Sequence, residues 1–102
     1  MPDVLLDYRR YTNEILDHMN RGLIRYWAAA RDAAGVPEEP YEATTLAEAL
    51  ENARRTRDVE FERVLSRSSF LIDGAPVGTR SHAAVDLPDG GILEVLPPFA
   101  GG

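Results

Sequence analysis

The stretch Ser69-Phe70-Leu71-Ile72-Asp73-Gly74-Ala75-Pro76-Val77 decides that part of this chain forms an antiparallel sheet. Two short apolar runs flank Asp73-Gly74, a dipeptide that tight type I′ turns favour because both of its residues must take a positive φ. The pattern therefore predicts a β-hairpin, with one strand before the turn and one after it.

The residues after the hairpin predict one more strand and then a tail. Gly78 to Ala84 has the composition of a loop, and a turn at Pro88-Asp89-Gly90-Gly91 follows the short extended piece 85–87. Ile92 to Leu96 is apolar enough for a last strand. The chain then ends Pro97-Pro98-Phe99-Ala100-Gly101-Gly102, where proline halts sheet pairing and the glycines have no side chain to anchor them, so we expect this tail to project.

Two helices are predicted before the hairpin. Thr45 is a favourable N-cap, with Glu48 three residues later in the capping-box position. Apolar residues then hold one face at helical spacing as far as Arg55, and these are Leu46, Ala49, Leu50 and Ala53. A further short helix is indicated by Phe61, Val64 and Leu65. Arg54, Arg55 and Arg57 fall where cations suit a helix C-terminus, and we expect a solvated arginine cluster there.

The region before these helices predicts a strand, a helix and an edge strand. Leu23 to Ala28 is rich in β-branched and aromatic residues, and Ala29 to Ala34 favours a short helix that Gly35 ends. Pro37 and Pro40 are expected to bracket a turn before a brief edge strand over 41–44. Exposed apolar residues of the sheet face are expected to form part of a partner site. The sequence does not assign the faces of Leu23, Trp27 and Leu71, and we expect these side chains to lie mostly in the core.

Residues 1–20 form an N-terminal extension in this interpretation, helical or disordered. Apolar residues recur in it at three- and four-residue steps, and they are Val4, Tyr8, Tyr11, Ile15 and Met19. Met19 could equally be the natural start, with a translated leader before it. We favour a loosely docked extension, followed by one folded domain over 21–102 that includes the tail 97–102.

Composition excludes several classes of function. The chain has 102 residues and a formal net charge of −6, and all 11 of its basic residues are arginine, so it has no basic surface for nucleic acid or anionic lipid. It has no cysteine, which removes thiolate metal sites and cysteine nucleophiles, and no long apolar run that would span a membrane. The expected location is cytoplasmic, with neither nucleic acid nor membrane as a partner.

Conventional catalytic motifs are missing. His18 and His82 have no second imidazole or thiolate at ligand spacing, so we assign no metal. Ser81 precedes His82, but a catalytic triad needs separate segments and an orienting acid. Glutamate pairs at 38–39 and at 60 and 62 are interpreted as solvated faces, and no glycine-rich loop precedes a helix as a phosphate loop would.

One reactive group remains, the α-carboxylate of Gly102. A carboxylate becomes electrophilic when it is converted to a mixed anhydride with a nucleotide, and this activation must come from another protein. Gly101 and Gly102 lack a Cβ and can thread a narrow channel, while Pro97-Pro98 gives the tail a stiff base. Six extended residues reach about 20 Å, enough to deliver the carboxylate into a partner's pocket. A Gly-Gly end can also be simple fraying.

The sequence resembles a known family at several places. The segment Tyr26-Trp27-Ala28-Ala29-Ala30-Arg31-Asp32-Ala33-Ala34-Gly35 is similar to that family's first strand leading into its short helix. The Asp-Gly hairpin, the late Asp-Gly-Gly turn and the ending Leu96-Pro97-Pro98-Phe99-Ala100-Gly101-Gly102 extend the likeness over about residues 22 to 102. Together they resemble the small subunits of molybdopterin synthase, in the ubiquitin-like sulfur-carrier family that also includes the thiamine sulfur carrier.

The resemblance implies an α+β, ubiquitin-like β-grasp fold, with a mixed sheet packed on one main helix and a free C-terminal Gly-Gly tail. It implies that an adenylating enzyme of the ubiquitin-activating type consumes ATP to adenylate Gly102, and that a sulfur donor then makes a thiocarboxylate. The chain itself would be a carrier that binds no cofactor. Catalytic residues are expected on the large molybdopterin synthase subunit, into which the tail inserts. Phe99, Ala100 and Gly101 would thread the partner. As an apolar residue on an exposed tail, Phe99 packs either on the chain's own sheet or in a partner's groove, and we favour the groove.

Three alternatives stay open at this point. The same carrier chemistry could feed thiamine or cysteine synthesis. A ubiquitin-like modifier would instead form isopeptides with lysines of other proteins, although this chain, which has no lysine, could not form chains on itself. A plain β-grasp interaction module would have an inert tail.

Overall fold

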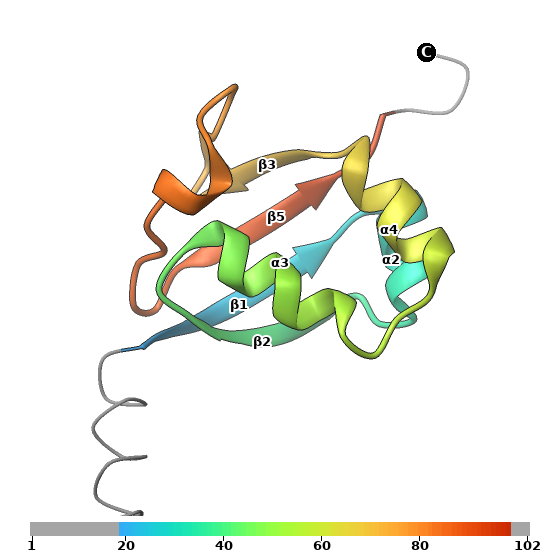
Figure 1. The fold of residues 1–102 in the computed structure, drawn as a ribbon, viewed down its shortest axis with the longest axis horizontal. Coiled ribbons are helices and arrows are strands. Elements are labelled where there is room, and N and C mark those ends of the chain that lie inside the picture. The colour runs from blue at the N-terminus through green and yellow to red at the C-terminus, as the bar shows by residue number, and fades with distance from the viewer. Residues whose placement is uncertain (1–18, 99–102) are drawn as a thin grey trace, which may run out of the picture.

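The chain folds into a five-stranded sheet with helices packed on one side of it, as the computed structural model of residues 19–98 shows (Figure 1). The elements run in the order β1 (Asn20–Tyr26), α2 (Ala28–Ala34), β2 (Glu38–Ala43), α3 (Leu46–Arg54), α4 (Val59–Ser66), β3 (Ser69–Ile72), β4 (Ala75–Pro76), the 3-10 turn η1 (His82–Ala84) and β5 (Ile92–Leu96). No helix in this part of the chain combines the length and the apolar character that crossing a bilayer requires.

The sheet is mixed, and its order is β2-β1-β5-β3-β4. The first and last strands, β1 and β5, lie side by side and parallel at its centre, and the other neighbouring pairs are antiparallel. Helix α3 lies across one face, and α2 and α4 lie together at the end toward which β5 points (Figure 1). This arrangement confirms the expected β-grasp fold, with a mixed sheet packed on one main helix.

The hairpin prediction is confirmed in detail. Asp73 and Gly74 both have positive φ angles, of 49° and 83°, as a type I′ turn requires. The Asp73 carboxylate also accepts a hydrogen bond from the backbone N–H of Ile92 at 2.8 Å, which ties the turn to the start of β5. Strand β4 is shorter than predicted, with two residues.

Helix α3 begins and packs as its spacing predicts. The Thr45 hydroxyl accepts from the Glu48 N–H at 3.3 Å, and the Glu48 carboxylate accepts from the N–H of Thr44 at 3.1 Å, one residue earlier than in a standard capping box. All four apolar positions of the predicted face are buried, and these are Leu46, Ala49, Leu50 and Ala53. The core therefore lies between α3 and one face of the sheet.

The prediction of a solvated arginine cluster is wrong for Arg57. Its side chain is 13% exposed, and its guanidinium pairs with Glu39 at 2.7 Å and donates to the Ala34 carbonyl at 3.1 Å. It also lies over the rings of Tyr26 and Phe61, with centroid distances of 5.6 and 4.9 Å. Arg57 therefore joins the loop after α3 to β1, β2 and α2. The prediction that Glu39 belongs to a solvated face is also wrong, because its carboxylate is paired with Arg57.

Two strand boundaries differ from the predictions. Strand β2 begins at Glu38 and contains Pro40, because this is an edge strand in which a missing N–H is tolerated. Strand β1 begins at Asn20, inside the predicted extension, and the other residues assigned to that extension, except Met19, lie outside the described part of the chain. A Cβ at Gly22 would overlap the Tyr41 ring, so glycine is required where β1 passes this side chain.

Candidate functional site: the outer sheet face and the base of the tail

The sheet has one covered face and one uncovered face. Strand residues that point toward α3 are buried, including Ile24 and Tyr26 on β1 and Leu93 and Val95 on β5. The residues that alternate with them point away from the helices and are only partly buried or exposed. We define the outer sheet face by the six residues Leu23, Trp27, Leu71, Ile92, Glu94 and Leu96.

The expectation that Leu23, Trp27 and Leu71 lie mostly in the core is wrong. All three are on the outer sheet face, and the Trp27 side chain is one of the largest exposed apolar groups of residues 19–98, at 44% exposure. The physical reason is that the helices cover only one side of the sheet. An exposed apolar surface of this kind is a candidate protein interaction site.

Cross-strand pairs align the outer sheet face. Leu23 on β1 lies opposite Ile92 on β5, and Glu94 lies opposite Leu71 on β3. Trp27 follows β1 directly, and its indole Nε1 donates to the Glu94 carboxylate at 3.2 Å. The apolar side chains on three strands therefore form one surface, with Glu94 among them.

Ion pairs border this surface along the edge strand β2. Arg21 and Arg25 on β1 lie directly opposite Glu42 and Glu38 on β2. Their charged groups are 3.2 Å apart in the first pair and 3.7 Å apart in the second. All four side chains are well exposed, so these pairs contribute little to stability and give the surface a polar rim.

The base of the tail lies at the end of β5. Pro97 is buried and Pro98 is exposed, directly after the central strand ends at Leu96. A groove of about 200 Å³ flanks the two prolines on the helix side. Its other lining residues come from α2 and from α4 with its C-cap, and they are Ala29, Glu60, Arg63, Val64 and Arg67. The tail therefore leaves from the middle of the sheet, between this groove and the outer sheet face.

The remaining residues of the predicted site, Phe99, Ala100, Gly101 and Gly102, lie outside the described residues. Their role as the threading segment and the reactive terminus stays a prediction. From Pro98, four extended residues span about 13 Å, so a carboxylate on this tail can reach a pocket in a partner that covers the outer sheet face.

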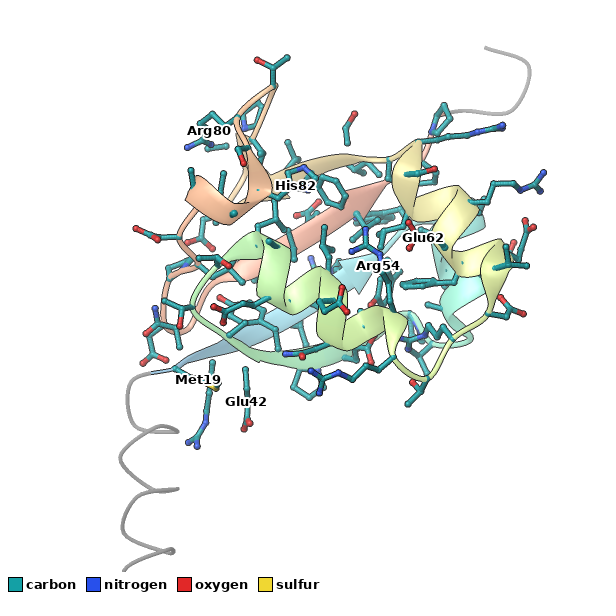
Figure 2. All side chains as sticks on the ribbon, viewed as in Figure 1. Met19, Glu42, Arg54, Glu62, Arg80 and His82 are labelled. Carbon is teal, nitrogen blue, oxygen red and sulfur yellow. The ribbon has the colours of Figure 1, made fainter. Side chains whose placement is uncertain are left out.

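A second hollow, of about 360 Å³, lies between the C-terminal end of α3 and the loop that contains His82. The His82 ring packs edge-on against Phe70, with 5.1 Å between centroids, and Arg54 beside the hollow is paired with Glu62 (Figure 2). Within residues 19–98, no three potential ligands from His, Asp and Glu are grouped closely enough to hold a metal ion.

The sequence predicts a partner site on the apolar sheet face, but it does not show which residues form that face, and Glu94 was not among the candidates. Strand β5 is apolar at Ile92, Leu93, Val95 and Leu96, so alternation did not show which side would be covered. A signal was present in the one charged residue inside this apolar strand, because a charge on the core side of a central strand would be strongly unfavourable.

No family model matches the sequence, and no curated protein matches it. Solved structures do match. The small archaeal modifier protein 1 (SAMP1) of Methanosarcina acetivorans aligns with a TM-score of 0.71 and 22% identity, over 83% of this chain and 99% of that one. A putative molybdopterin converting factor, subunit 1, from Pyrococcus furiosus aligns with a TM-score of 0.65 and 22% identity, over 78% of this chain and 99% of that one.

A third match comes from a protein–protein complex of subunits 1 and 2 of the molybdopterin-converting factor of Helicobacter pylori 26695. Its TM-score is 0.58 at 16% identity, with 80% of this chain and 99% of that one covered. The three matches span nearly the whole length of the other proteins. They show that this chain has the ubiquitin-like β-grasp fold that these proteins have.

Proposed function

We propose that this chain is a sulfur carrier, whose C-terminal Gly102 is adenylated and then converted to a thiocarboxylate. The observation that carries the proposal is the position of the base of the tail, Pro97-Pro98. This base follows the central strand of a β-grasp fold and lies beside an exposed apolar face centred on that strand. This arrangement would let a partner hold the folded body while its active site receives the terminus.

The chemistry needs a reactive carboxylate here and catalytic groups elsewhere. A Gly102 carboxylate oxygen attacks the α-phosphorus of ATP on the adenylating enzyme, and pyrophosphate leaves. A sulfur nucleophile from the donor then attacks the acyl carbon and displaces AMP, so that one carboxylate oxygen is replaced by sulfur. Gly101 and Gly102 leave the acyl carbon unobstructed, and this chain supplies positioning, not catalysis. The use of ATP by the partner is consistent with a cytoplasmic location.

For the acceptor, we propose the molybdopterin branch, with this chain as the small synthase subunit. The Pro-Pro base followed by an apolar residue and Ala-Gly-Gly supports this branch, and so does the shared fold with molybdopterin converting factor subunit 1 from two organisms. The large synthase subunit would receive the tail, transfer its sulfur to the pterin precursor and carry the catalytic side chains.

A second candidate function is protein modification. The likeness to a small archaeal modifier protein supports it, because that fold match is the highest-scoring of the three reported above. A modifier would use the same adenylated Gly102, but a lysine amine would displace AMP and an isopeptide would form.

The test is reconstitution with purified components. The chain is incubated with ATP, the source organism's adenylating enzyme and sulfide, and its intact mass is measured. We expect a gain of about 16 Da, the difference between sulfur and oxygen. Deletion of Gly102 tests whether the mass is gained at this residue, and omission of ATP tests whether the gain requires adenylation.

Adding a lysine-rich acceptor protein separates the two candidates. Sulfur transfer to a pterin precursor in the presence of the large synthase subunit supports the molybdopterin branch. Covalent conjugates of higher mass that disappear without Gly102 would support modification instead. A chain that never gains mass under these conditions would contradict both.

A further inference from the structure

Two opposite charges lie side by side on the uncovered side of the sheet. Arg25 on β1 and Glu94 on β5 are register partners on the two central strands, which run parallel (Figure 1). Both side chains alternate with buried residues, so they point away from the helices. An apolar pair, Leu23 opposite Ile92, precedes them along the same two strands. The outer sheet face therefore has a cation and an anion at adjacent positions of its central strands.

Neither charge uses its full hydrogen-bonding capacity within residues 19–98. The Arg25 guanidinium is 3.7 Å from the Glu38 carboxylate on the edge strand, and the Arg25 side chain is 37% exposed. The hydrogen bond to the Glu94 carboxylate comes from Trp27 Nε1, a neutral donor at 3.2 Å. The ion pairs in this part of the chain do not join Arg25 to Glu94. Because a guanidinium has five N–H donors and a carboxylate has about four acceptor sites, both groups can take further partners.

This arrangement is complementary to itself. A twofold axis that runs between β1 and β5, parallel to both and in the plane of contact, places each β1 position of one copy over the matching β5 position of the other. Arg25 of each copy then faces Glu94 of the other copy. The same rotation sets Leu23 of each copy against Ile92 of the other, and every contact is formed twice. Sheets that pack face to face lie about 10 Å apart, a separation that side chains of this length span.

A second copy of the chain is the occupant that this pattern selects. An unrelated protein would need a cation and an anion at the same spacing in the opposite order, whereas a second copy presents them by symmetry. The charged strand residues on and beside the outer sheet face are nearly balanced in sign, and they are Arg21, Arg25, Glu38, Glu42 and Glu94. Most of the net charge of −6 therefore lies elsewhere on the chain, and its repulsion between copies is screened over about 8 Å at physiological salt.

We propose that the free chain forms a twofold dimer through the outer sheet face, in which Arg25 of each copy pairs with Glu94 of the other. The two β5 strands point the same way in this dimer, because the axis is parallel to them, so both tail bases leave from one end of the interface. The dimer goes beyond the carrier function, since it requires neither Gly102 nor any second protein. A partner that docks on this face must compete with it.

Analytical ultracentrifugation of the purified full-length chain measures the dimer over a range of concentrations. Arg25→Glu and Glu94→Arg each reverse one charge and set like charges against each other at both contacts, and combining them in one chain restores opposite charges. Glu51→Arg is the matched control for Glu94→Arg. It changes the net charge equally, on an exposed side chain of α3 away from the uncovered side of the sheet. Thermal unfolding shows that each variant is folded.

We expect a concentration-dependent dimer of the unmodified chain, and we expect either single reversal to raise its Kd about a hundredfold. The chain with both reversals should recover most of the affinity. Glu51→Arg should dimerise at least as well as the unmodified chain, because it lowers the net negative charge. An equimolar mixture of the Arg25→Glu and Glu94→Arg chains should form a mixed dimer, since position 25 of each then faces an opposite charge at position 94 of the other.

A chain that stays monomeric up to about 1 mM would overturn the proposal. A dimer that both single reversals leave intact, or single-reversal chains that stay monomeric when mixed, would also overturn it, because the contact between copies would then not be Arg25 with Glu94. The intact-mass assay separates this failure from failure of the proposed function. If the chain gains about 16 Da and remains monomeric, only the dimer is lost. If the chain dimerises and never gains mass, only the carrier function is lost.

Discussion

At the scale of single residues, Tyr26 shows how a buried polar group is accommodated in the core. Its ring is packed edge-on against Phe61, and its hydroxyl donates to the Glu39 carboxylate, which Arg57 also holds. Burial, together with the nearby Glu39 carboxylate, raises the pKa of Tyr26 well above its ordinary value of 10.0. The phenol therefore stays protonated in the folded chain at pH values where an exposed tyrosine ionises.

This shift predicts alkaline destabilisation. Above pH 10 the unfolded chain loses the Tyr26 proton while the folded chain keeps it. The contribution of Tyr26 to the free energy of unfolding is therefore fully present below pH 10 and is lost as the pH rises above it. The chain has no lysine, so tyrosines dominate titration in this window. Urea unfolding at pH 8 and at pH 11 measures the effect.

Tyr26→Phe supplies the comparison. It should cost about 1 kcal/mol at pH 8 through the lost hydrogen bond, and its stability should fall less between the two pH values. If the unmodified chain and Tyr26→Phe lose equal free energy of unfolding between pH 8 and pH 11, the fold does not hold Tyr26 protonated.

At the scale of elements, α3 and the tail have opposite roles. Leu50 is 1% exposed in the core, so Leu50→Ala should lower the free energy of unfolding by roughly 2–5 kcal/mol. Deleting Gly102 should abolish sulfur transfer. It should leave stability almost unchanged if the terminus projects, as the sequence predicts, because a projecting terminus buries little surface. Chemical denaturation and the mass assay on both variants test the pair. Equal stability losses would mean that the tail is packed against the body.

The elements could be predicted from the sequence wherever a local rule decides them. The Asp73-Gly74 turn needs two positive φ angles, and α3 follows from its cap and its apolar spacing, so local sequence is enough to predict both. Arg57 could not be interpreted correctly, because its partners Glu39 and Ala34 are brought to it by tertiary folding. The extent of β2 was missed because Pro40 is tolerated only at a sheet edge, and the edge is a property of strand order.

At the scale of the whole molecule, the central fact is that helices cover only one face of the sheet (Figure 1). That fact could not be read from β5, whose apolar residues occur at both alternating positions, and it explains why Trp27 and Leu71 are outside the core. The chemical hypothesis for the tail came from its composition and from a family resemblance. The structure adds a central strand that delivers Pro97 and Pro98 beside an uncovered apolar surface.

The most direct test of the carrier function is the mass of the C-terminal peptide from the chain isolated from its own cells. Fragmentation assigns any added mass to a residue. We predict that a fraction of the peptide is heavier by about 16 Da, with the increment on Gly102, and that this fraction disappears when the adenylating enzyme is deleted. A Gly102 found solely as an ordinary carboxylate, or joined to lysines of other proteins, would contradict the sulfur-carrier account.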